Sequence, residues 1–141
     1  MRVLGLDLGS KRIGVAVSDR SGTIASPLLV LARSGSPRRD HEQIARLVTE
    51  EEAEAVVVGL PLNMDGSLGP AAKAARKEAA LIATVVGVPV HEWDERRSTV
   101  TADQAMMQAG LRAPERRQHV DKIAAAVFLQ AWLDAHHAGG R

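Results

Sequence analysis

The sequence has no cysteine and very few aromatic residues. The absence of cysteine excludes disulfides, thiol catalysis and cysteine-ligated zinc. Trp93, Phe128 and Trp132 are the only tryptophan, phenylalanine or tyrosine residues, so we expect a core of valine, leucine, isoleucine and alanine. No apolar run is long enough to span a bilayer, and the chain begins with a strand pattern rather than a signal peptide. We therefore expect a cytoplasmic protein with no membrane partner.

A large net charge is also missing. The formal net charge is +1, so the overall charge gives no indication of a nucleic-acid partner. In the segment 96–122, basic residues outnumber acidic ones. This segment predicts either a local basic face or an ordinary solvated helical surface, and both interpretations stay open.

Hydrophobic periodicity predicts one mixed sheet. Apolar runs typical of strands occupy 2–8, 12–19, 23–33, 53–60 and 88–93, and helical patterns occupy 41–53, 70–86, 98–110 and 120–137. Pro27 favours an edge position or a bulge for the third strand, and we interpret 34–40 as a loop. The segment 112–119 is either a connection or the start of the last helix. Three strands followed by βα units predict an α/β fold in a single domain over 1–141, with helices on both faces of the sheet. The first three strands should be antiparallel, and the fourth and fifth should run parallel to the first.

An aspartate interrupts the first apolar strand. Asp7 lies in the run "RVLGLDL", where an isolated ionised carboxylate costs several kcal/mol unless it has a partner. An arginine, the backbone N–H groups of a turn or a metal ion could each compensate this charge.

Two further acidic positions lie where ligands bind in α/β proteins. Asp94 and Glu95 follow the fifth predicted strand, and ligands bind at the carboxyl ends of such strands. Because side chains alternate along a strand, only one of the two can face a given site, and periodicity does not choose between them. Asp121 lies on the same helical stripe as Phe128 and Trp132. A polar strand end and a helix-capping acid are the structural alternatives for these positions.

The three acidic positions could converge in the predicted sheet. They lie on the first strand, at the end of the fifth strand and near the start of the last helix. Clustered carboxylates without histidine or cysteine favour hard divalent ions, Mg²⁺ or Mn²⁺. Two such ions stabilise both the attacking and the leaving oxygen in phosphodiester cleavage. If the acids converge, the pattern fits a two-metal site for phosphodiester cleavage.

Four segments together resemble the YqgF family, whose members are described as pre-16S rRNA nucleases and as Holliday junction resolvases. The segments are "MRVLGLDLGSKRIGVAVSD", "VVVGLPLNMDGSLGP", "DERRST" and "VDKIAAAVFLQAWL". They span essentially the whole chain, in order and with family-like spacing. The resemblance implies a ribonuclease H-like fold with a five-stranded mixed sheet in the order 3-2-1-4-5.

The resemblance also implies which acids act. The family's catalytic and metal-binding acids match Asp7, Glu95 and Asp121, which favours Glu95 over Asp94. Arg97 is a departure, since the family usually carries an apolar residue there.

Several other residues fit substrate binding at the same site. The candidates are Lys11, Asn63, Ser67, Arg96, Arg116 and Arg117. The structural alternatives are a hairpin tip for Lys11, a turn before a helix for Asn63 and Ser67, and an ion pair with Asp94 for Arg96. For Arg116 and Arg117 the alternative is a solvated helix surface.

The function implied is a metal-dependent nuclease that matures the 5′ end of 16S rRNA, with nucleic acid and precursor ribosomal particles as partners. Cleavage of branched DNA is the close alternative, because the same carboxylate chemistry serves both. A non-catalytic nucleic-acid-binding module is an alternative of another class, against which the presence of all three acids argues. A sugar kinase or actin-like ATPase has a similar phosphate loop but needs two lobes. The sequence leaves the oligomeric state open.

Overall fold

The computed structural model describes residues 1–97 and 113–139, and for residues 97, 113–121 and 137–139 it describes the backbone only. The predicted helix over 98–110 therefore lies outside the described residues. The elements, in chain order, are β1 (Val3–Leu8), β2 (Arg12–Ser18), β3 (Ala25–Ala32), α1 (Pro37–Glu50), β4 (Ala55–Leu60), α2 (Pro70–Val86), β5 (Val90–Asp94), the 3₁₀ turn η1 (Glu95–Arg97) and α4 (Ala113–Gly139).

The five strands form one mixed sheet in the order β3-β2-β1-β4-β5. β1 pairs antiparallel with β2 and parallel with β4, β2 pairs antiparallel with β3, and β4 pairs parallel with β5. Strand order and directions are as predicted. β3 is an edge strand, and its register shifts where Pro27 lies opposite Ala16, since proline cannot donate to the ladder. The prediction for Pro27 is confirmed.

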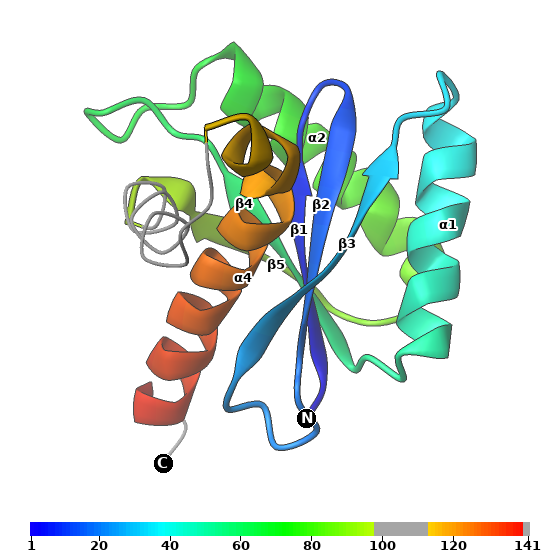
Figure 1. Ribbon diagram of the computed structural model, residues 1–141, viewed down its shortest axis with the longest axis vertical. Helices are drawn as coiled ribbons and strands as arrows, with labels where there is room; N and C mark the ends of the chain where they lie inside the picture. Colours follow the sequence, from blue (N-terminus) through cyan, green and yellow to red (C-terminus); the bar gives the residue numbers. More distant parts are fainter. Residues whose placement is uncertain (98–112, 140–141) are drawn as a thin grey trace.

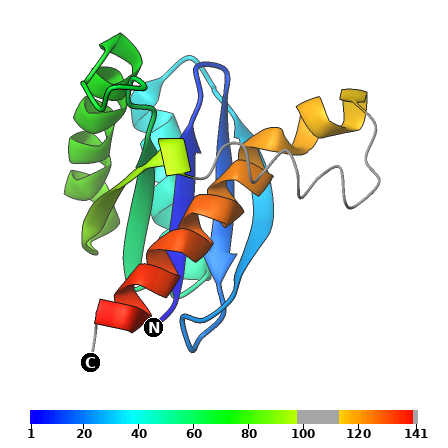
Figure 2. The same cartoon turned by 90° about the vertical axis from the view of Figure 1, so that its left-hand side faces the viewer.

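Helices cover both faces of the sheet (Figure 1). α1 and α2 pack on one face, where Ile44 and Ile82 join Leu4 and Leu6 of β1 in a fully buried apolar cluster. α4 crosses the other face (Figure 2) and brings Phe128 into a second cluster. Successive residues of β1 thus enter opposite layers of the core, as the alternation of side chains along a strand requires.

α4 also lies against the edge strand β3. The backbone N–H of Ala25 donates to Oε1 of Gln130 at 2.8 Å. The last helix therefore contacts the first half of the chain by a directional bond as well as by apolar packing.

One helix start differs from the prediction, and a second decides between two interpretations. The segment 34–40, predicted as a loop, contains the beginning of α1, because Ser36 caps the helix and Pro37 occupies its first turn. The hydroxyl of Ser36 accepts a hydrogen bond from the backbone N–H of Arg39 at 3.3 Å. α4 begins at Ala113, ahead of the helical pattern over 120–137, with Pro114 in its first turn. Of the two interpretations of 112–119, the start of the helix is confirmed.

No helix within the described ranges has the length and apolar character needed to cross a membrane. That the chain is a single domain stays a prediction.

Candidate active site

Asp7 lies where β1 leaves the core. It faces Gly14 in the β1–β2 ladder and is only half-buried, whereas the preceding residues Val3–Leu6 are buried. Side chains alternate along β1, and Val3 belongs to the cluster beneath α4, so Asp7 points to the α4 face of the sheet. Two residues later the chain turns, with the backbone N–H of Gly9 donating to the carbonyl of Asp7 at 3.1 Å.

The side chain of Glu95 lies over β4, the parallel neighbour of β1. Glu95 is the first residue of η1, directly after β5, and its side chain is half-buried. A Cβ built on Gly59 of β4 would lie 2.7 Å from Cγ and 2.8 Å from Oε1 of Glu95. Gly59 follows Val58, which pairs with Leu6 of β1, so Gly59 and Asp7 occupy adjacent strands at the same level. Glu95 and Asp7 are thereby brought to the same end and face of the sheet.

Gly59 was not singled out from the sequence. It is the one residue without a side chain in the otherwise apolar strand "AVVVGL", and this interruption was the available signal. The missing side chain leaves the space that the carboxylate of Glu95 occupies.

Asp94 is held elsewhere. Its carboxylate accepts from the backbone N–H of Arg96 at 3.0 Å and from the Arg96 guanidinium, with Nε 3.0 Å from Oδ1 and 2.9 Å from Oδ2. This ion pair raises the pKa of Arg96. Trp93 packs against the cluster beneath α4, and Glu95, two residues later, lies on the same face over Gly59. Asp94 is instead bound by Arg96.

Asp121 belongs to α4, one turn before Ala125. α4 lies directly on β1 at that point: a Cβ on Gly5 would be 3.2 Å from the carbonyl oxygen of Ala125 and 3.0 Å from Cβ of Leu129. The side chain of Asp121 lies outside the described part of the chain. Among the residues that the structure does describe, no three or more histidine, aspartate or glutamate residues form a group that could hold a metal. The convergence of all three acids therefore stays a prediction.

Asn63 and Ser67 form a closed loop after β4. Nδ2 of Asn63 donates to Oγ of Ser67 at 3.0 Å, and the backbone N–H of Asn63 donates to the Ser67 carbonyl at 3.0 Å. Ser67 in turn donates its hydroxyl to Oδ1 of Asp65 at 2.6 Å and its backbone N–H at 2.9 Å, which lowers the pKa of Asp65. Arg96 joins this loop to η1, because Nη1 donates to the carbonyl of Met64 at 3.0 Å. The loop is thus fixed beside the end of β5.

The remaining basic candidates are placed less fully. Lys11 is exposed in the turn between β1 and β2. Arg116 and Arg117 belong to the first turns of α4, and their side chains lie outside the described residues. The β1–β2 turn, the loop after β4 and the beginning of α4 lie at one end of the sheet (Figure 1).

Known proteins that are similar to this chain identify its family. The family model RuvX, described as Holliday junction resolvase, matches residues 1–135. The chain belongs to the RuvX family. This confirms the resemblance seen in the sequence. RuvX relatives named "Putative pre-16S rRNA nuclease" include one from Myxococcus xanthus, 48% identical over 96% of this chain and 89% of its own length, and one from Anaeromyxobacter sp., 49% identical over 98% and 100%.

Solved structures similar to this RuvX chain show its fold. Thermus thermophilus RuvC in complex with a Holliday junction substrate has a TM-score of 0.63 at 22% identity, covering 98% of this chain and 96% of that one. The Fowlpox virus resolvase in complex with Holliday junction DNA has a TM-score of 0.56 at 12% identity, covering 96% and 98%. The fold is therefore ribonuclease H-like, as expected.

Proposed function

We propose that this protein is a metal-dependent nuclease that hydrolyses phosphodiester bonds in RNA, acting in the maturation of the 5′ end of pre-16S rRNA. The observation that carries the proposal is the pair of carboxylates on the face that α4 covers. Asp7 lies near the carboxyl end of β1, and the Glu95 side chain, which follows β5, lies over Gly59 near the carboxyl end of the adjacent parallel strand β4. Asp121, on the helix that crosses this face, is the proposed third acid.

The residues present fit a hard divalent cation. The donors are carboxylate oxygens, and the missing side chain of Gly59 leaves room for the Glu95 carboxylate above the sheet. Asp7, Glu95 and Asp121 would hold Mg²⁺ or Mn²⁺, and we expect two ions. When bound, such ions activate the attacking water and stabilise the charge that develops on the leaving oxygen.

The chain's own residues would position the substrate. Lys11 in the β1–β2 turn and Arg116 and Arg117 on α4 would contact phosphate groups, and the loop carrying Asn63 and Ser67 would line the nucleic-acid backbone. Arg96 already orients that loop through the carbonyl of Met64, so its role includes holding the substrate-facing surface. Its guanidinium is paired with Asp94, which fixes its orientation beside the proposed phosphate site.

RNA is favoured as substrate by the relatives named for pre-16S rRNA, which are similar along nearly the whole chain. Precursor ribosomal particles are then the expected partners, and the cytoplasm the expected location. Cleavage of branched DNA is the second candidate, and the description of the family as Holliday junction resolvase supports it.

The deciding experiment compares two substrates and three proteins. A precursor-rRNA fragment spanning the mature 5′ end and a four-way DNA junction are incubated with Mn²⁺, Mg²⁺ or chelator. The proteins are the wild type, Asp7→Asn and the control Glu92→Gln, which alters an exposed carboxylate on β5 that pairs with Arg76. We expect the wild type and the control to cleave the RNA with metal, and Asp7→Asn to be inactive. Cleavage of the junction alone would support a resolvase, and binding without cleavage of either substrate would support a non-catalytic module.

A further inference from the structure

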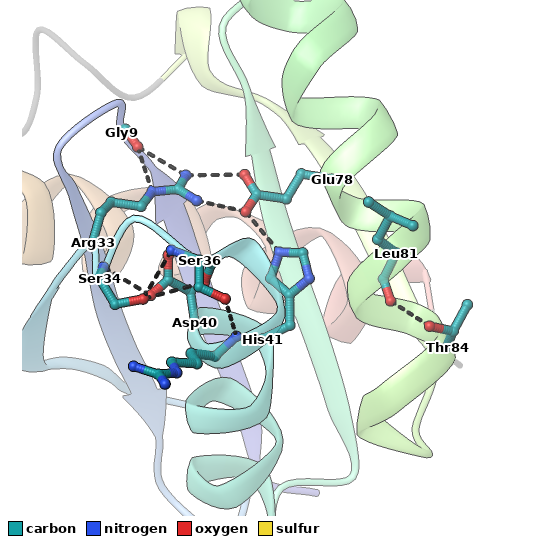
Figure 3. Close-up of polar contacts among 10 residues, drawn as sticks. Gly9, Arg33, Ser34, Ser36, Asp40, His41, Glu78, Leu81 and Thr84 are labelled. Carbon is teal, nitrogen blue, oxygen red and sulfur yellow. Dashed lines mark hydrogen bonds and ion pairs between the residues drawn. The ribbon is translucent and has the colours of Figure 1, made fainter.

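Arg33 binds the turn between β1 and β2 from the face of the sheet opposite α4. Its Nε and Nη2 atoms donate to the carbonyl of Gly9 at 3.0 and 2.8 Å. Its backbone N–H donates to the carbonyl of Lys11 at 2.9 Å. One residue at the end of β3 thus fixes two carbonyl groups of the turn that follows Asp7. Figure 3 shows the bonds to the carbonyl of Gly9.

Glu78 of α2 holds the guanidinium of Arg33 in place. Nη1 donates to Oε2 at 2.6 Å and Nη2 donates to Oε1 at 2.9 Å, so the pair is bidentate. The two side chains are only 20% and 17% exposed, which shields the pair from water. Burial alone would raise the pKa of Glu78, but the hydrogen bonds and charges of Arg33 and His41 outweigh it and hold that pKa below its usual range. A planar guanidinium can bind a carboxylate with two nitrogens and still donate to a carbonyl, which a lysine ammonium cannot reproduce.

α1 also supports the pair of Arg33 and Glu78, through two of its residues. Nε2 of His41 lies 2.7 Å from Oε2 of Glu78, and His41 is buried. Oδ1 of Asp40 accepts from the backbone N–H of Ser34, the residue after Arg33, at 3.0 Å. The side chain of Arg33 is therefore held by α2, with support from α1, and the backbone of the β3–α1 connection is held by α1 (Figure 3).

A buried ion pair of this kind is weak evidence for stability, because its desolvation opposes the attraction between the charges. Its geometry instead specifies one conformation of the turn. The same turn begins with the hydrogen bond from Gly9 to the carbonyl of Asp7, so a continuous chain of bonds runs from α2 to the proposed catalytic strand.

We propose that Arg33, oriented by Glu78, is a positioning residue that sets the β1–β2 turn and with it the placement of Asp7. This role rests on the proposed nuclease function, but the conformation of the turn can be measured without any substrate.

The first test uses Arg33→Lys, which keeps the charge and removes the planar fork. We expect faster hydrogen exchange of the backbone amides at 9–11 and a fall in kcat for RNA cleavage of about ten- to a hundredfold. The matched control is Arg2→Lys, since Arg2 pairs with Glu51 at 3.0 Å with similar exposure, 28% and 25%, and lies at the start of β1 rather than its end. The control should leave both the turn amides and kcat unchanged.

The second test exchanges the charges in the double variant Arg33→Glu with Glu78→Arg. A carboxylate at position 33 can attract an arginine at position 78 but cannot donate to the carbonyl of Gly9. We therefore expect the melting temperature to recover relative to Arg33→Glu alone, while amide protection of the turn and cleavage stay reduced.

Three results would overturn the proposal. The first is a wild-type rate of hydrogen exchange for the turn amides in Arg33→Lys, and the second is a wild-type kcat in a variant whose turn amides exchange faster. The third is full recovery of cleavage in the double variant with the charges exchanged. If the wild type cleaves no nucleic acid, the nuclease function fails, and the exchange rates still report whether Arg33 fixes the turn.

Discussion

We expect Gly59→Ala to displace the side chain of Glu95 while the sheet keeps its structure. The new Cβ would lie 2.7 Å from Cγ and 2.8 Å from Oε1 of Glu95, and ordinary contact begins at 3.4 Å. The carboxylate must therefore move by about 0.7 Å or more. The neighbours named are atoms of a side chain rather than of the backbone, so the strand itself need not move.

The two expected effects on stability nearly cancel. Gly59 has no left-handed backbone conformation, so alanine fits β4 and gains about 0.5–1 kcal/mol over glycine in a strand. Forcing Glu95 from its rotamer costs about 0.5–1.5 kcal/mol. The free energy of unfolding should therefore change by less than about 1 kcal/mol. A misplacement of about 1 Å in a catalytic group lowers the rate roughly a hundredfold, so cleavage should be nearly lost.

The assay measures kcat for RNA cleavage with Mn²⁺ together with the melting temperature. Val57→Ala is the matched control, because Val57 is fully buried on the same face of β4, two residues before Gly59. Its cavity should cost about 2 kcal/mol of stability and leave kcat unchanged. Normal kcat in Gly59→Ala would refute the reasoning that Glu95 acts from above Gly59. A large loss of stability would refute the claim that only the side chain of Glu95 moves to make room for the new Cβ.

Three further outcomes follow from the proposed site and from one surface loop. Added Mn²⁺ should raise the melting temperature of the wild type more than that of Asp7→Asn, and equal shifts would mean that Asp7 is not a metal ligand. Reversing the charges of Arg116 and Arg117 should reduce the salt slope of RNA binding by roughly one to two, whereas an unchanged slope would place the binding surface elsewhere. The backbone N–H of Thr23 is the main cause that lowers the pKa of Asp19 to about 2, from a usual 3.8. The ionised Asp19 therefore stabilises the fold above about pH 4, and this contribution is lost towards pH 2. Plotted against pH, the melting temperatures of the wild type and Asp19→Asn should converge between these values, and a constant difference would contradict the prediction.

The strands could be predicted because their apolar runs and turns are local properties of the sequence. Pro27 even marked the edge strand and the register shift of β3. The start of α1 was missed, although Ser36 before Pro37 is a local helix-start signal of the kind that marks α2 at Pro70. The residues directly after Pro37 are charged and the apolar stripe begins only at Ile44, so periodicity alone places the start of this helix too late.

The site was predictable only in part. Alternation along β5 could not choose between Asp94 and Glu95, because the strand's sequence does not tell which of its faces α4 covers. In the structure Trp93 packs beneath α4, and Glu95, two residues later, lies on the same face. The contact between Arg33 and Glu78 joins residues 45 positions apart, and nothing local to either residue indicates it. Such pairs follow from the packing of α2 on the sheet, which a pattern in one segment does not contain.

The position of α4 has a consequence for synthesis on the ribosome. Ala25 of β3 donates to Gln130 of α4 across 105 residues, and the strands beneath α4 come from the first half of the chain. At about 5–20 residues per second, the nascent strands wait roughly 5–20 s for the helix that covers them. During that time the apolar face formed by Val3, Ala16 and Val57 has no cover, so a nascent chain should attract chaperones until α4 emerges.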